Sequence, residues 1–118
     1  MPDTLDIHNL QNDSAEMQNA MAKSAEKAAG YLRALSNPSR LLLLCQLVES
    51  EMSVGELEVA LNLGQAYVSQ QLARLRSEGI VTARRDGRIV YYSLADSRVR
   101  PVLQVLYEQF CSNPDDVV

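Results

Sequence analysis

Apolar residues recur at helical spacing through the first part of the chain and predict two successive helices. Asp13-Ser-Ala-Glu16 has the form of a capping box, so a first, alanine-rich helix is expected from there to about Leu35. Asn37-Pro38 predicts a second helix start, because proline at the first helical position has no N–H that needs a partner. The second helix, 39–49, is apolar on nearly every side, which predicts a place at the centre of the core.

The middle of the chain predicts two short helices joined by a tight turn. Ser53-Val-Gly-Glu56 is a further capping box and starts the first of these helices. Gly64 marks the turn, and a helix over 65–78 follows, with Gly79 as its stop. Its inward positions recur at i, i+4 and i+7 and are Val68, Leu72 and Leu75. The opposite side of this helix is polar.

The spacing of apolar residues changes to that of strands after Gly79. Two β-rich runs, 80–85 and 88–94, flank Asp86-Gly87, which is a strong signal for a β-hairpin. Helical spacing returns near Asp96, or after a first turn at Pro101, and continues to the end of a last helix.

The order of these elements predicts a mainly α-helical fold with a small β-hairpin, in the order of four helices, two strands and a fifth helix. One domain is expected over 14–111, between a flexible N-terminal arm, 1–13, and a flexible C-terminal tail, 112–118. The chain has no run of about 18 apolar residues, which a membrane-spanning helix needs. Its N-terminus lacks the basic and apolar segments of a signal peptide, so we expect the protein to stay in the cytoplasm.

Charge is distributed unevenly along the chain. The net charge is −4, but residues 69–100 hold seven arginines against three acidic residues, a local charge of +4, so the remainder carries −8. Phosphates respond to charges within about a Debye length, roughly 8–10 Å at moderate salt. An acidic protein with one basic face is therefore able to bind nucleic acid.

The basic stretch falls on elements that fit the major groove of DNA. The second helix of the short pair carries polar side chains able to reach base edges, and glutamine suits the N6 and N7 atoms of adenine. The hairpin brings arginines to phosphates or to the adjoining minor groove. We therefore predict a winged helix-turn-helix that binds double-stranded DNA. The residues expected to contact the DNA are Gln65, Tyr67, Ser69, Gln70, Gln71, Arg74, Arg84, Arg85 and Arg88.

Three motifs within residues 31–111 resemble the ArsR/SmtB family of winged-helix repressors. They are the L-x-x-P-x-R entry to the second helix, the VSQQLARLR-x-EGIV stretch of the fourth, and the GR-x-VYY second strand of the hairpin. Gly64 stands where the family usually has a serine cap, and Gln71 replaces a frequent histidine, so the base preference is expected to differ. The resemblance implies a transcriptional repressor that forms a homodimer through its first and last helices on a two-fold symmetric operator. The apolar stripe of the last helix, with Tyr107 and Phe110, independently favours a dimer.

The two cysteines of the chain, Cys45 and Cys111, have two interpretations. Either thiol can be a small buried hydrophobic group, and this interpretation is strongest for Cys45 in its leucine-rich helix. A cysteine in the second helix paired with one that ends the last helix, however, resembles the group that includes SqrR, BigR and HlyU. Members of that group sense reactive sulfur or oxidants. The resemblance implies that persulfide or polysulfide acts on Cys45 and Cys111 and switches the affinity for DNA. Tyr107, four residues before Cys111, lines their pocket or packs in the dimer interface.

Several alternatives stay open at this point. The inducer is a peroxide or another oxidant, or the repressor has no thiol switch, or the apolar last helix makes the chain a protein-interaction module. A metal sensor fits less well, because Ser53-Val54-Gly55 stands where arsenic and cadmium/lead sensors have paired cysteines, and His8 is the only histidine. No metal or other cofactor is expected. An enzyme is not expected either, since the chain lacks a glycine-rich phosphate loop and clustered carboxylates.

Overall fold

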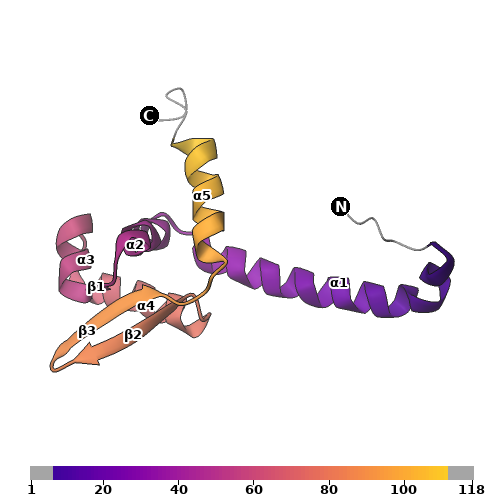
Figure 1. Ribbon diagram of the computed structural model, residues 1–118. Helices are drawn as coiled ribbons and strands as arrows, with labels where there is room; N and C mark the ends of the chain where they lie inside the picture. Colours follow the sequence, from indigo (N-terminus) through magenta and orange to yellow (C-terminus); the bar gives the residue numbers. More distant parts are fainter. Residues whose placement is uncertain (1–6, 112–118) are drawn as a thin grey trace. The chain divides into compact units, whose positions relative to one another are not determined.

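The computed structural model describes residues 7–111, with side chains from Ser14 onward. Five helices and three strands are formed in this part of the chain (Figure 1). They are α1 (Ile7–Leu35), α2 (Pro38–Glu49), β1 (Met52–Ser53), α3 (Val54–Leu61), α4 (Gln65–Ser77), β2 (Val81–Asp86), β3 (Ile89–Leu94) and α5 (Val99–Phe110). The predicted fold class, mainly α-helical with a small antiparallel hairpin, is confirmed. The chain divides into two units, one up to Arg33 and one from Ala34 onward, and the second holds all elements after α1.

The start of α1 differs from the prediction. The helix begins at Ile7, so the expected start at the capping box Asp13–Glu16 is wrong. No glycine or proline interrupts residues 7–13, and the helix therefore runs through the cap sequence. Residues 7–13 of the predicted flexible arm are helical, while the rest of that arm and the tail 112–118 lie outside the described residues.

The predicted starts of α2 and α3 are confirmed by their hydrogen bonds, whereas α5 begins at Val99, between the two predicted starts at Asp96 and Pro101. At α2, the Asn37 side chain accepts a bond of 3.1 Å from the Arg40 N–H, with Pro38 at the first helical position. At α3, Ser53 and Glu56 form both bonds of the capping box, of 3.1 and 2.8 Å. The start of α4 has Gly64 as its N-cap without a side-chain bond, which costs only a few tenths of a kcal/mol relative to a serine cap.

The three strands form one antiparallel sheet in the order β1-β3-β2. Val81 pairs with Leu94 and Asp86 with Ile89, and Gly87 turns the hairpin with a φ of +64° that favours glycine. Strand β1 was not predicted, because a strand of two residues is too short to show a period. It pairs Met52 with Tyr92 and so joins the end of α2 to the hairpin.

The core of the second unit is built on α2. This helix packs against α3, α4 and β3, and its buried residues are Leu43, Leu44 and Leu47. The predicted inward face of α4 is confirmed, with Val68, Leu72 and Leu75 each fully buried. The prediction that α2 is surrounded by the core is wrong on one side, since Leu42 is 52% exposed and Cys45 is exposed.

Among residues 7–111, none of the helices combines the length and the apolar composition that a membrane span requires.

Loss of core volume at α2 is expected to destabilise the fold. Leu44→Ala should lower the free energy of unfolding by about 2–5 kcal/mol, because it removes apolar burial and leaves a cavity. The matched control is Val59→Ala, at a side chain that is 83% exposed, which should stay within about 0.5 kcal/mol of wild type. Denaturant titration at equal protein concentrations measures both. Equal stability of the two variants would contradict this description of the core.

Candidate functional site

The outward side of α4 carries most of the polar residues predicted to contact DNA. Burial of Val68, Leu72 and Leu75 fixes the rotation of the helix, so its opposite side faces away from the core. Besides Tyr67, which is 38% exposed, four of the predicted residues on α4 are exposed, namely Gln65, Ser69, Gln70 and Arg74. These side chains are available to a ligand that lies along the helix.

The remaining two predicted residues of α4 lie on the flank of the helix that meets α2. Tyr67 donates a hydrogen bond of 3.0 Å from its hydroxyl to the Ser39 hydroxyl. Gln71 is partly buried, and its side-chain carbonyl oxygen accepts a bond of 2.8 Å from Arg40. Ser39 and Arg40 were not among the predicted site residues. Arg40 belongs to the L-x-x-P-x-R motif, but local spacing says nothing of a partner 31 positions away.

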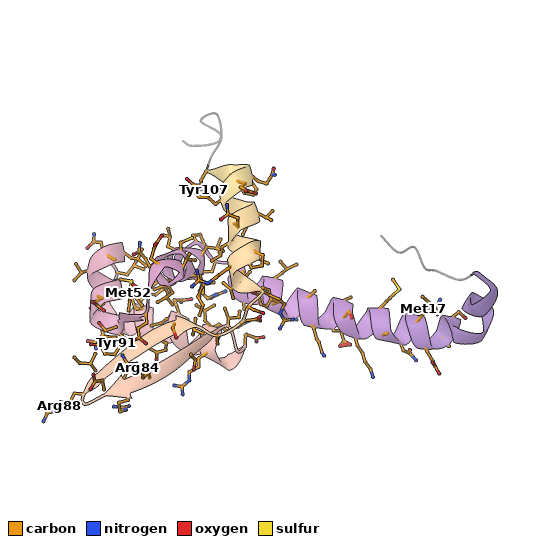
Figure 2. All side chains as sticks on the ribbon, viewed as in Figure 1. Met17, Met52, Arg84, Arg88, Tyr91 and Tyr107 are labelled. Carbon is orange, nitrogen blue, oxygen red and sulfur yellow. The ribbon has the colours of Figure 1, made fainter. Side chains whose placement is uncertain are left out.

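The structure divides the hairpin arginines into two kinds. Arg84 forms a forked ion pair with Glu51, with distances of 2.5 and 3.2 Å, and its guanidinium carbon lies 4.8 Å from the centre of the Tyr91 ring (Figure 2). Arg85 and Arg88 are exposed, and Arg88 stands at the tip of the hairpin (Figure 2). Strand alternation places Arg84 and Arg85 on opposite faces of the sheet.

The partners of Arg84 tie the hairpin to the end of α2. The hydrogen bond from Arg84 lowers the pKa of the Glu51 carboxyl, and the charge of Arg84 adds to the effect. A lowered carboxyl pKa means that the pair is intact at neutral pH and is lost only as the pH falls through that pKa. Glu51 and Tyr91 were not predicted as site residues, because both act through an arginine far away in sequence.

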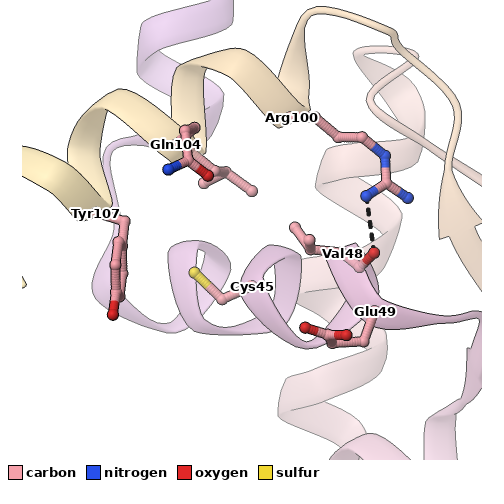
Figure 3. A pocket seen from close by; sticks show the side chains of 7 residues that line it. Cys45, Val48, Glu49, Arg100, Gln104 and Tyr107 are labelled. Atoms are coloured by element: carbon pink, nitrogen blue, oxygen red, sulfur yellow. Dashed lines mark hydrogen bonds between the residues drawn. The ribbon is translucent and has the colours of Figure 1, made fainter.

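A pocket opens between α2 and α5 beside one of the thiols. Its volume is about 410 Å³, and Figure 3 shows its walls. The lining residues are Cys45, Val48, Glu49, Arg100, Leu103, Gln104 and Tyr107. One wall is held by Arg100, which donates a bond of 2.8 Å to the Val48 carbonyl oxygen. That oxygen belongs to the last turn of α2, where carbonyls lack partners within the helix and attract positive charge.

Both cysteines are exposed in the single chain, so the interpretation of buried hydrophobic thiols is not supported. Figure 3 shows the sulfur of Cys45 directed from α2 toward Gln104 and Tyr107. Cys111 caps the end of α5, where its N–H donates a bond of 2.8 Å to the Tyr107 carbonyl oxygen. The pKa of the Cys45 thiol is raised, first because the pocket walls partly remove water and second because a negative charge on Cys111 opposes ionisation. The two thiols therefore interact electrostatically.

Within residues 14–111, no three His, Cys, Asp or Glu side chains lie close enough together to hold a metal ion.

The raised pKa of Cys45 predicts how its reactivity depends on pH and on Cys111. Only the thiolate is alkylated, so at neutral pH Cys45 should react more slowly than an ordinary thiol. In Cys111→Ser the opposing charge is gone, and the pH at which Cys45 reaches half its maximal rate should fall. Cys111→Asp keeps a negative charge and should leave that pH raised. Mass spectrometry of the Cys45 peptide after iodoacetamide treatment follows the rate. Identical pH profiles of the Ser and Asp variants would contradict the interaction.

Comparison with known proteins identifies this arrangement. Residues 37–83 match the model of the bacterial regulatory protein, arsR family. The chain is 45% identical over 92 residues to the biofilm growth-associated repressor of Xylella fastidiosa. The aligned residues make up 78% of this chain and 81% of that repressor. The relatives found are transcriptional regulators rather than enzymes.

Solved structures agree with the sequence match. Reduced HlyU from Vibrio cholerae superimposes with a TM-score of 0.74 at 39% identity, covering 79% of this chain and 98% of that one. The homodimeric winged helix-turn-helix domain of Mb0332 from Mycobacterium bovis gives a TM-score of 0.69 at 29% identity, covering 75% and 82%. The predicted winged helix-turn-helix is therefore confirmed, and the chain belongs to the ArsR family of bacterial transcriptional regulators.

Proposed function

We propose that the chain is a homodimeric, DNA-binding repressor whose operator affinity is switched by persulfide or polysulfide at Cys45 and Cys111. The observation that carries the switch is the pocket between α2 and α5, into which Cys45 opens and where Cys111 influences its ionisation. Two thiols that interact across two helices offer a site for a bridge that ties those helices together.

DNA binding is proposed for the outward side of α4 and the tip of the hairpin. In a helix-turn-helix, the second helix enters the major groove and the flanking elements contact phosphates. Gln65, Ser69 and Gln70 offer hydrogen-bonding groups to base edges, while Arg74, Arg85 and Arg88 offer charge to phosphates. Tyr67, Gln71 and Arg84 already form bonds within the protein, so we assign them supporting roles.

Dimerisation is proposed through α1 and α5. Tyr107 and Phe110, three residues apart on one side of α5, are 57% and 62% exposed, an apolar surface that a second copy would cover. One structural neighbour, Mb0332, is itself homodimeric. A symmetric pair presents two copies of α4, the recognition helix of each protomer, to the DNA. The two half-sites then lie about one helical turn apart, roughly 34–36 Å.

The sulfur chemistry of the switch balances in two steps. A cysteine thiolate attacks the outer sulfur of a persulfide R–S–SH; the S–S bond of the donor breaks, and the thiolate R–S⁻ leaves. The second cysteine thiolate then attacks the protein-bound sulfur of the new persulfide, forms a disulfide and expels hydrosulfide. If the protein persulfide first takes up another sulfur atom from a second donor, attack on its middle sulfur expels hydrosulfide and gives a trisulfide.

A bridge between α2 and α5 would alter the relation of the two recognition helices in the dimer. Release of DNA then requires that the bridged and unbridged forms bind the operator with different free energies, typically by about 1–3 kcal/mol or 5–150-fold. HlyU of Vibrio cholerae is named a transcriptional activator, so a reporter gene under the operator is needed to establish the direction of regulation.

The two kinds of hairpin arginine are expected to differ in the salt dependence of DNA binding. Each phosphate neutralised adds about 0.9 to the slope of log affinity against log salt. Arg88→Gln should therefore weaken binding and reduce this slope by about one for each phosphate that the arginine neutralises in the wild type. Arg84→Gln is the matched control, because Arg84 is held by Glu51, and should leave the slope unchanged. Equal slope changes in both variants would show that Arg84 leaves Glu51 to bind a phosphate.

Treatment of the reduced protein with polysulfide is expected to lower operator affinity at least about fivefold. Cys45→Ser and Cys111→Ser should each abolish the response, because either change prevents the bridge, and the double variant controls for reactions elsewhere. Fluorescence anisotropy measures affinity, and intact mass distinguishes a disulfide from a bridge with added sulfur.

Three outcomes would contradict the proposed switch. Unchanged affinity of the wild type with polysulfide excludes it. A response to peroxide alone, without added sulfur in the product, assigns the site to oxidants. A response to zinc alone makes the chain a metal sensor instead.

A further inference from the structure

Two hydrogen bonds join neighbouring residues of α2 to the recognition helix. The Tyr67 hydroxyl donates to the Ser39 hydroxyl at 3.0 Å, and the Arg40 guanidinium donates to the Gln71 carbonyl oxygen at 2.8 Å. Tyr67 and Gln71 are four residues apart and lie above one another on the same flank of α4. Two points of attachment along one flank restrict both the rotation and the tilt of that helix.

The α2 side of this contact is itself held in place. The Nε atom of Arg40 donates to the Ala34 carbonyl oxygen at 2.5 Å, so the guanidinium bridges two acceptors. The backbone N–H of Arg40 is bonded to the N-cap Asn37. A planar guanidinium already held by the Ala34 carbonyl oxygen loses little further freedom when it also binds Gln71, which suits it to fixing the position of that side chain.

The contact also fixes the orientation of the Gln71 amide. A guanidinium has donors only, so the oxygen of the amide must face Arg40 and its nitrogen must face away. Bidentate recognition of adenine uses both the oxygen and the nitrogen of a glutamine amide. Gln71 is partly buried beside α2, whereas the neighbouring Gln70 is exposed on the outward side of α4.

We propose that Ser39 and Arg40 are positioning residues that hold α4 for DNA binding, and that Gln71 belongs to this contact rather than to the base-reading side chains. The proposal rests on the proposed insertion of α4 into the major groove. It does not depend on the thiol switch. Its first consequence is that two adjacent glutamines of one helix have different tasks.

The test compares Gln71→Ala with Gln70→Ala in the reduced, full-length protein. The probes are the duplex that the wild type selects from random DNA and a set of its single base-pair variants. Gln71→Ala should weaken binding to every duplex by the same factor, at most about tenfold, because DNA binding must then order α4 without this one bond to a charged donor. Gln70→Ala should change the order of preference at one base pair. A changed base preference in Gln71→Ala would overturn the proposal.

Arg40→Gln provides the second arm of the test. This variant should weaken binding at least as much as Gln71→Ala, because it also removes the bond to the Ala34 carbonyl oxygen. The double variant should be no weaker than Arg40→Gln alone, because the bond to Gln71 is already lost in that variant. The salt slope should stay at the wild-type value. A slope reduced by about one would make Arg40 a phosphate contact, and additive losses would make the two residues independent; either result overturns the proposal.

Smaller changes keep the test decisive if Arg40→Gln does not fold, as judged by thermal melting. Tyr67→Phe and Ser39→Ala each remove a single hydroxyl from the other bond. A uniform, non-additive loss of affinity in these variants supports the positioning role, and unchanged affinity in both overturns it. A wild type that selects no DNA at all would overturn the proposed function itself, an outcome distinct from each of these.

Discussion

The buried face of α2 is the constraint on which the rest of the second unit depends. Leu43, Leu44 and Leu47 pack against α3, α4 and β3, and burial of a leucine side chain contributes about 1.5–3 kcal/mol. Because one face of α4 must meet these leucines, its polar side is turned outward. Because β3 must also meet them, the hairpin extends from the same core. The opposite side of α2 is left exposed, and there the pocket with Cys45 opens. A single packed face thus positions both the polar side of α4 and the pocket beside Cys45.

The role of the basic residues is decided by their partners rather than by their number. Residues 69–100 concentrate the arginines of the chain, yet Arg84 is paired with Glu51 and Arg100 is bonded to the end of α2. Both hold elements together. Arg85 and Arg88 are exposed on the hairpin and suit a role in the electrostatic attraction of DNA. All seven of these arginines are exposed, so counting charge along the chain could not show which of them are bonded within the protein.

Local sequence was a good guide wherever the determining interaction is local. The spacing of Val68, Leu72 and Leu75 predicted the inward face of α4, and Asp86-Gly87 predicted the hairpin turn, since both depend on residues a few positions apart. The predicted start of α1 was wrong, because a cap sequence begins a helix only where the preceding residues cannot extend it. Strand β1 depends on pairing with a strand some forty positions later, and its two residues are too few to show the alternation of apolar and polar positions that marks a strand. The partners Ser39, Arg40 and Glu51 were missed for the same reason.

Helix α2 carries two of its attachments at opposite ends. Its first turn holds α4, and its last turn is held by Arg100 beside the pocket. A helix of 12 residues is about 18 Å long, so substitutions at one end leave the contacts at the other end in place. Substitutions beside the pocket should therefore leave the bond between Arg40 and Gln71 intact, and substitutions at that bond should leave the bond from Arg100 intact. The two ends of one short helix are thus open to change independently of each other.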